Sequence, residues 1–570
     1  MTEAAPPVNP TSRREQLLLL AAALLASVAA ILWSWRNHAF LLYGDAEAHI
    51  HIARRLFDSH RPGLTQLGSV WLPLSHLLMV PFIAIGPWWR SGFGPAIPSA
   101  LCYILGCLGL YKLSRKWLSP AASALGLAFF SLNPNLLYLQ TTAMTEPLFL
   151  CELVWSVLLL VEWHESVNNE QKKADRLLWA IIAVLVCAVY TRYDGWILAV
   201  LAWAAMAVCL YRRGRLLQRN FILASVVLAL APAGWMLYNA VVFQDWLDFM
   251  RGPYSAKAIE ARTASSIVDP HPGWHNPWVA FQYFLKAAEM DAAARSFGWL
   301  ILAVSLAGTV LAFLKSRTKP ALSEGFIIRR SNQSWLWTLF LWLPLPFYAY
   351  SVSYGSVPIF LPVWKPFSWY NTRYGMELLP AFAFFAGFSV EFLLQRLNPS
   401  RRTRHTAIFA ACLVLVVANS LTMLREHPLT YVEAQKNTAA RGYYNAVIPA
   451  ALAHLHQLDP TGEILMNTSM YPSFIPNAGL TYRQTVNESD KQFYWAALDY
   501  PFHSAIILAF AGDDIDKAVQ THPEHLRVYQ RFHSPNQGWD QADATLYVTD
   551  TFPGVQTTPL STAVPAIPAQ

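Results

Sequence analysis

The sequence predicts an α-helical membrane protein that crosses the bilayer many times and carries a small α/β domain after its last span. Of the 570 residues, 55% are hydrophobic and only 14% are charged, and the mean hydropathy is +0.29, which is typical of polytopic membrane proteins. Basic residues lie in short clusters between the apolar runs, a pattern that orients membrane helices. From about residue 425 the chain becomes polar, and short β-rich runs appear.

Apolar runs of membrane-spanning length give the expected helices. The first run follows Arg13 and Arg14 and ends in Trp33 and Trp35, which suit the membrane interface. A cleavable signal peptide is the alternative for this run. We expect a retained helix with a cytoplasmic N-terminus. Together with this first run, the sequence predicts about eleven spans, at residues 17–35, 97–115, 120–138, 147–163, 177–192, 195–211, 220–241, 297–315, 334–352, 374–395 and 405–424.

The segment 71–86 decides the predicted topology. It is short and contains Pro73, Pro81 and His76. If it does not cross, every later basic cluster falls on the cytoplasmic side, as the positive-inside rule requires. We therefore expect a juxtamembrane or re-entrant segment, whose broken backbone is covered by protein. The outer loops are then the stretch after residue 42, residues 140–146, 191–195, 244–295 and 355–373.

The chain divides by composition into three parts. Residues 1–424 form the membrane domain, residues 425–560 an extracytoplasmic α/β domain, and residues 561–570 a disordered tail rich in Pro, Thr and Ala. Within the second part, residues 438–458 are typical of a helix. Four β-rich runs predict strands at residues 463–468, 505–510, 526–532 and 544–549.

Cysteine content and charge exclude several classes of protein. All six cysteines lie in or beside apolar runs, and no polar loop holds a pair, so neither a disulfide framework nor a zinc site is indicated. The net charge of +7 is spread among the cytoplasmic clusters instead of forming one basic patch. We therefore expect no nucleic-acid partner.

The stretch Tyr43–Arg55 concentrates charge beside the first span. It holds two carboxylates, two imidazoles and two guanidiniums, and charges this close to a membrane need a structural or functional reason. Asp45 suits a helix N-cap. On that helix Glu47 would share a face with His51 and Arg54. A juxtamembrane helix with a solvated polar face is the alternative.

Other polar residues gather on the predicted outer face. Carboxylates converging there could bind a divalent cation or take a proton from a hydroxyl, and cations could bind a phosphate. The candidate catalytic or metal-binding acids are Asp45, Glu47 and Glu146. The candidate substrate-binding residues are Arg54, His76, Arg192, Asp194, Lys365, Tyr370, Arg373 and Tyr374.

Each of these candidates also has a structural interpretation. Glu146 precedes Pro147 and could simply place a negative charge at a helix N-terminus. Arg192 and Asp194 could form an internal ion pair. The aromatic residues at 364–374 could form an interfacial belt. His76 could be a polar residue of an irregular segment.

Four motifs together resemble a known family. They are Gly44-Asp45-Ala46-Glu47, Trp71-Leu72-Pro73-Leu74-Ser75-His76, Thr145-Glu146-Pro147-Leu148, and Arg373-Tyr374 followed by Leu378-Leu379-Pro380-Ala381. Over residues 15–425 the chain resembles the membrane glycosyltransferases of the GT-C fold, near the protein mannosyltransferase and aminoarabinose transferase branch. Such enzymes take sugars from polyprenyl phosphates at the outer face of the membrane.

The resemblance implies roles for individual residues. Asp45 would activate the acceptor hydroxyl, Glu47 would assist it in orientation or metal binding, and Glu146 would be the acid of the second loop. Arg373 would hold the donor phosphate, with Arg54 and Lys365 as further candidates. Many relatives have two adjacent acids, whereas Ala46 separates them here.

The resemblance also implies partners and a location. The partners would be a polyprenyl-phosphate sugar, membrane lipids, and a protein, lipid or glycan acceptor. We expect the bacterial inner membrane, with the C-terminal domain periplasmic. A transporter or flippase of a lipid-linked or anionic solute is an alternative, although transporters favour paired repeats and ionisable groups at mid-membrane, which the sequence lacks. A non-catalytic scaffold that displays the C-terminal domain is a third interpretation.

Overall fold

The computed structural model describes residues 12–263, 269–317, 334–396, 402–469, 471–534 and 542–554. The tail predicted at 561–570 lies outside these ranges. The chain divides into two compact units. We call Met1–Ala46 with Ser69–Lys436 the helical unit, and Glu47–Gly68 with Asn437–Gln570 the α/β unit.

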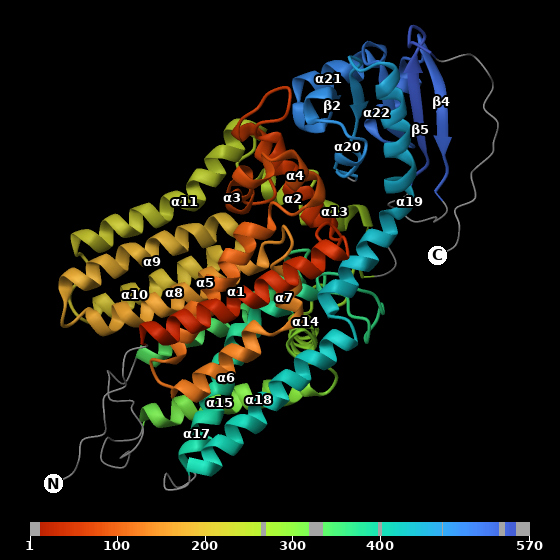
Figure 1. The fold of residues 1–570 in the computed structure, drawn as a ribbon. Coiled ribbons are helices and arrows are strands. Elements are labelled where there is room, and N and C mark those ends of the chain that lie inside the picture. The colour runs from red at the N-terminus through yellow and green to blue at the C-terminus, as the bar shows by residue number, and fades with distance from the viewer. Residues whose placement is uncertain are drawn as a thin grey trace, which may run out of the picture. The chain divides into compact units, whose positions relative to one another are not determined.

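The helical unit is a bundle of long apolar helices with shorter ones between them. α8 packs against α5 and α9 (Figure 1). It is buried on most sides, whereas α1 leaves most of its apolar side chains exposed. Its helices are α1 (Arg13–Arg36), α3 (Leu74–Ile83), α4 (Gly86–Ser91), α5 (Ala96–Ser114), α6 (Pro120–Ser131), α7 (Pro134–Leu139), α8 (Glu146–Ser166), α9 (Gln171–Thr191), α10 (Tyr193–Tyr211), α11 (Arg219–Phe243), α12 (Asp248–Arg251), α13 (Ala256–Thr263), α14 (Pro277–Ala292), α15 (Phe297–Arg317), η3 (Ser334–Trp342), α16 (Pro344–Tyr354), η4 (Thr372–Leu378), α17 (Leu379–Arg396) and α18 (Arg402–Arg425).

Within the described residues, nine helices are long and apolar enough to cross a membrane. They correspond to nine of the eleven predicted spans. The other two predicted spans are interrupted. Residues 120–138 form α6 and α7, with Asn133 capping the new helix and Pro134 at its first position. Residues 334–352 form the 3₁₀ helix η3 and then α16, which starts at Pro344. Because proline has no N–H and disfavours helix in the residue before it, both sites favour a break.

The proline-bearing segment after the opening stretch forms two short helices. α3 has ten residues and α4 has six. A ten-residue helix is about 15 Å long, which is roughly half the hydrocarbon thickness of a bilayer. The prediction that this segment does not form a spanning helix agrees with the structure.

The α/β unit is built on a five-stranded sheet of order β2-β1-β3-β5-β4. β1 (Ile464–Met466) pairs in parallel with β2 (Thr485–Val486) and β3 (Ile506–Phe510), and β5 (Ala544–Thr549) pairs antiparallel with β3 and β4 (Leu526–Phe532). Strands lie in all four predicted runs. β2, of only two residues, was not predicted, because so short a strand carries no alternating pattern.

Helices of the α/β unit complete its core. The core gathers side chains from the sheet, α21 (Gln492–Asp499) and α22 (Asp514–Thr521), including Leu465, Ile507 and Val519. The unit also holds η1 (Leu64–Leu67), α20 (Phe474–Asn477), η5 (Tyr482–Gln484), η6 (Glu488–Asp490) and η7 (Pro501–His503). The helix predicted at 438–458 is present but begins earlier, since α19 covers Leu429–Leu458, and its residues up to Lys436 belong to the helical unit.

Residues 47–68 belong to the α/β unit although they follow the first span directly in sequence. Arg483 donates to the Phe57 carbonyl at 3.1 Å, and His60 Nε2 lies 3.0 Å from the Thr485 carbonyl. α2 (Gly44–Arg55) begins at Gly44, so Asp45 lies in its first turn and not at the predicted N-cap. The Asp45 carboxylate has another partner, described below.

Candidate active site at Arg373

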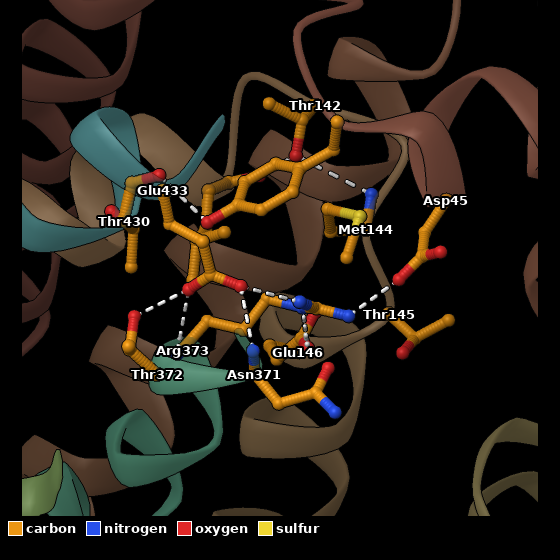
Figure 2. A network of polar contacts seen from close by, with 12 residues as sticks. Asp45, Thr142, Met144, Thr145, Glu146, Asn371, Thr372, Arg373, Thr430 and Glu433 are labelled. Carbon is orange, nitrogen blue, oxygen red and sulfur yellow. Dashed lines mark hydrogen bonds and ion pairs between the residues drawn. The ribbon is translucent and has the colours of Figure 1, made fainter. Parts of the chain in front are cut away.

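Arg373 is a buried cation that joins three carboxylates. It is the second residue of η4, which begins directly after Asn371, a residue whose backbone adopts a left-handed conformation with φ of 56°. Its Nη2 is 2.5 Å from Asp45 Oδ2, its Nε 3.1 Å from Glu146 Oε1, and its Nη1 2.9 Å from Glu433 Oε1 (Figure 2). A buried guanidinium is stable only when its charge and its donors are satisfied in this way.

The three carboxylates come from distant parts of the helical unit. Asp45 lies in the first turn of α2, Glu146 is the first residue of α8, and Glu433 lies in the second turn of α19. Their side chains are 45%, 0% and 3% exposed, respectively. Of the three, Asp45 is therefore the carboxylate that a substrate can reach.

A second guanidinium shares one of these carboxylates. Arg192, between α9 and α10, donates from Nη1 to Glu146 Oε1 at 3.4 Å and from Nε to Asp194 Oδ2 at 3.1 Å. Its Nη2 binds the Tyr348 hydroxyl at 2.6 Å and Glu377 Oε1 at 3.1 Å. The Arg192–Asp194 ion pair considered from the sequence is present, and it is one part of a larger network that ties α8, α10, α16 and η4 together.

Tyr374 links the two arginines. Its ring centroid lies 5.0 Å from the Arg373 guanidinium carbon and 5.1 Å from that of Arg192, within range for cation–π attraction. It also stacks on Tyr348 at 5.1 Å between centroids. The residue that follows Arg373 therefore holds both cations in one cluster.

Tyr43 covers another side of Arg373. Its ring centroid is 5.1 Å from the guanidinium carbon, and its hydroxyl donates to the Thr430 carbonyl at 2.7 Å. Burial, reinforced by the negative charge of Glu433, raises the pKa of Tyr43 well above its usual value. Tyr43 therefore stays protonated and acts as a hydrogen-bond donor, which leaves proton acceptance to a carboxylate.

Two predicted site residues lie instead in the α/β unit. Glu47 is buried and accepts a charge-assisted hydrogen bond from Arg441. Burial raises the pKa of Glu47 in spite of this arginine. Arg54 pairs with Asp58 at 2.8 Å. Residues two apart on a helix are separated by a rotation of about 200° around its axis, so their side chains point in nearly opposite directions. Asp45 and Glu47 accordingly bind different arginines, Arg373 and Arg441. This arrangement does not agree with the predicted assistance of Asp45 by Glu47.

Three further candidates also lie in the helical unit. Lys365 is exposed, and its carbonyl accepts from the Tyr283 hydroxyl at 2.7 Å. Tyr370 forms an isolated antiparallel bridge with Phe360. His76 is fully buried in α3. The network around Arg373 thus brings together six of the predicted residues: Asp45, Glu146, Arg192, Asp194, Arg373 and Tyr374.

Three members of the network were not predicted from the sequence. Glu377 and Tyr348 bind Arg192, and Glu433 binds Arg373. Glu377 could have been found in the sequence, because a carboxylate inside the apolar run 374–395 is costly without a partner. Glu433 could not have been found in this way, since it lies beyond residue 424, where the chain is polar and one more charge does not stand out.

The acids predicted as metal ligands are otherwise engaged. Asp45 and Glu146 share the Arg373 guanidinium, and Glu47 binds Arg441. Across the part of the chain that the structure describes, no three His, Cys, Asp or Glu side chains are grouped as a metal site. This donor set does not fit a divalent cation, so no step below is routed through one.

Solved structures identify the fold. The chain is similar to ArnT from Cupriavidus metallidurans bound to undecaprenyl phosphate, with 13% identity, a TM-score of 0.53, and coverage of 95% of this chain and 99% of that chain. The apo state of the same protein gives 15% identity and a TM-score of 0.51, over 94% of this chain and 99% of that chain. No protein-family model matches the chain, and no curated protein matches its sequence. The chain has the GT-C fold, as its motifs predicted.

Proposed function

We propose that this protein transfers a sugar from a polyprenyl-phosphate donor to a hydroxyl acceptor at the membrane surface. One observation carries the proposal: a buried guanidinium contacts the partly exposed carboxylate of Asp45 at 2.5 Å. A cation that can neutralise a phosphate and a carboxylate that can take a proton thus lie side by side. These are the two groups that the reaction requires.

Arg373 serves the donor side of the reaction. The bond between the anomeric carbon and the phosphate oxygen breaks, and its electrons go to that oxygen. A phosphodiester with one negative charge becomes a phosphomonoester with two, and the preorganised guanidinium stabilises the charge that develops. Because Glu146 and Glu433 hold Nε and Nη1, Nη2 is the donor that a phosphate would approach.

Asp45 serves the acceptor side. Its carboxylate takes the hydroxyl proton as the acceptor oxygen bonds to the anomeric carbon. The products are the glycosylated acceptor, the polyprenyl phosphate, and a protonated Asp45 that returns its proton to water. The 45% exposure of the Asp45 side chain supports this role, because both an acceptor and water need access to it.

A lipid-linked donor agrees with the fold. ArnT, a structurally similar protein, has been crystallised with undecaprenyl phosphate, and the present chain has nine helices suited to a bilayer among its described residues. We propose the bacterial inner membrane as its location, with a cytoplasmic N-terminus and a periplasmic α/β unit. The acceptor would be a protein, a lipid or a glycan.

The test is transfer of radiolabel from a panel of polyprenyl-phosphate sugars to membrane extract, using the full-length protein in liposomes. Wild type is compared with Asp45→Asn, with and without a chelator. Asp245→Asn is the matched control, because Asp245 pairs with Arg251 at an exposed site outside the network.

Label should reach product with wild type and the control but not with Asp45→Asn. If wild type consumes no donor, or if Asp45→Asn transfers as well as wild type, the proposal fails, and a transporter or a scaffold becomes the better explanation. Loss of transfer in the chelator arm would reveal a metal requirement.

A further inference from the structure

We propose that Glu433 is the positioning residue of Arg373, an inference that rests on the function proposed above. Glu433 touches no substrate in this scheme. It fixes the conformation of the one side chain that meets the donor phosphate, and it does so from outside the region in which the sequence places the membrane domain.

Both carboxylate oxygens of Glu433 bind the segment that carries Arg373. Oε1 accepts from the Asn371 N–H at 2.8 Å and from Arg373 Nη1 at 2.9 Å. Oε2 accepts from the Thr372 hydroxyl and from the Arg373 N–H at 3.3 Å. One buried carboxylate thus holds the backbone and the guanidinium of the same residue (Figure 2).

This arrangement restricts Arg373 at both ends. The first N–H groups of a helix have no partner within the helix, and here Glu433 supplies one for the start of η4. Because the backbone N–H and Nη1 bind the same carboxylate, the long arginine side chain closes into a ring and loses most of its rotameric freedom. Nε and Nη2 then point toward Glu146 and Asp45.

Glu433 is itself anchored. One turn earlier in α19, the Thr430 N–H and hydroxyl both donate to Asn135 Oδ1 at 3.0 Å, and the Thr430 carbonyl accepts from Tyr43. Asn135 in turn donates to the Asp291 carbonyl at 3.0 Å. The first turns of α19 are therefore fixed to α7 and α14, and the position of Arg373 follows from theirs.

A double-mutant cycle of donor turnover tests this role, with the full-length protein in liposomes. Glu433→Gln keeps the shape of the side chain but removes its charge and one acceptor oxygen. We expect kcat to fall about tenfold and the KM for the donor to change by less than about threefold, because the cation stays in the site while its alignment is lost. In an Arg373→Lys background, the same substitution should lower kcat by less than about twofold.

Glu426→Gln is the matched control, since Glu426 pairs with Arg295 on the exposed surface seven residues before Glu433. Thermal melting of every variant separates loss of folding from loss of positioning. Equal losses of kcat in the two backgrounds, or a Glu433→Gln variant as fast as wild type, would overturn this inference alone. An inactive wild type would overturn the proposed function together with it.

Discussion

Asp45 and Arg373 lie 328 positions apart in the sequence, yet Asp45 Oδ2 and Arg373 Nη2 are 2.5 Å apart in the structure. The proposed base and the proposed phosphate-binding cation are thus each other's partners in the protein without substrate. An incoming phosphate would compete with the Asp45 carboxylate for the same guanidinium nitrogen. This competition has a measurable consequence.

Replacing Asp45 with Asn should abolish transfer and strengthen phosphate binding. Loss of the base should lower kcat by about 10²- to 10⁴-fold. Loss of the competing charge should tighten binding of the product polyprenyl phosphate by about two- to fivefold. A change of this size matches the free energy of a partly exposed ion pair. Equilibrium binding of a labelled polyprenyl phosphate checks this, with Asp245→Asn as control. Weaker binding to the Asn variant would show that the two groups do not compete.

Replacing Arg373 with Lys should affect chemistry more than folding. Lysine keeps the positive charge near the three carboxylates. Its N–H donors all lie on one nitrogen, however, whereas the guanidinium presents three nitrogens in a fixed plane, one to each carboxylate. Transfer should fall by about 10²-fold, because the developing phosphate charge loses its aligned partner. Donor turnover and thermal melting, measured on the same preparations, check the prediction. A large fall in melting temperature with unchanged turnover per folded molecule would contradict it.

Replacing Arg192 with Met should affect the stability of the protein more than its chemistry. Its removal leaves the carboxylates of Glu146, Asp194 and Glu377 in a buried site with one cation fewer. Breaking such a network costs about 3 kcal/mol or more. Denaturant unfolding in detergent provides the measurement. Arg251→Met, which breaks an exposed pair with Asp245, should cause no measurable loss.

His51 should make the α/β unit sensitive to acid. It is buried in α2 beside Arg55 and Arg54, and burial lowers its pKa to about 3. Because the folded state disfavours the charged imidazole, its contribution to stability is fully present above the unfolded pKa of about 6.5 and is lost as the pH falls toward 3. At pH 5 the loss is about 2 kcal/mol.

The pH dependence of unfolding tests this. Between pH 7.5 and pH 5, wild type should lose about 2 kcal/mol more than His51→Gln, which cannot take up the proton. His454→Gln, at an exposed position of α19, is the control and should follow wild type. Identical pH profiles for wild type and His51→Gln would show that another group dominates the acid response.

Local sequence determined most elements of this protein and several of its candidate site residues. Apolar runs of sufficient length predicted eleven spans, nine of which correspond to long apolar helices among the described residues, and four β-rich runs each contain a strand. Length and apolarity identify a helix that crosses lipid, and β-rich composition identifies a strand, so both can be read from local sequence. Asp45, Glu146, Arg192 and Arg373 stood out because a charge beside a membrane span is costly without a function or a partner.

Only the tertiary structure decided which charges meet. Asp45 binds Arg373 while Glu47 binds Arg441, since residues two apart on one helix point in nearly opposite directions. Glu433 joins the network from a helix whose sequence resembles that of any polar segment. Ion pairs between distant segments leave no local pattern, because the charge of each residue is neutralised by a residue that is remote in sequence and that only the fold brings near.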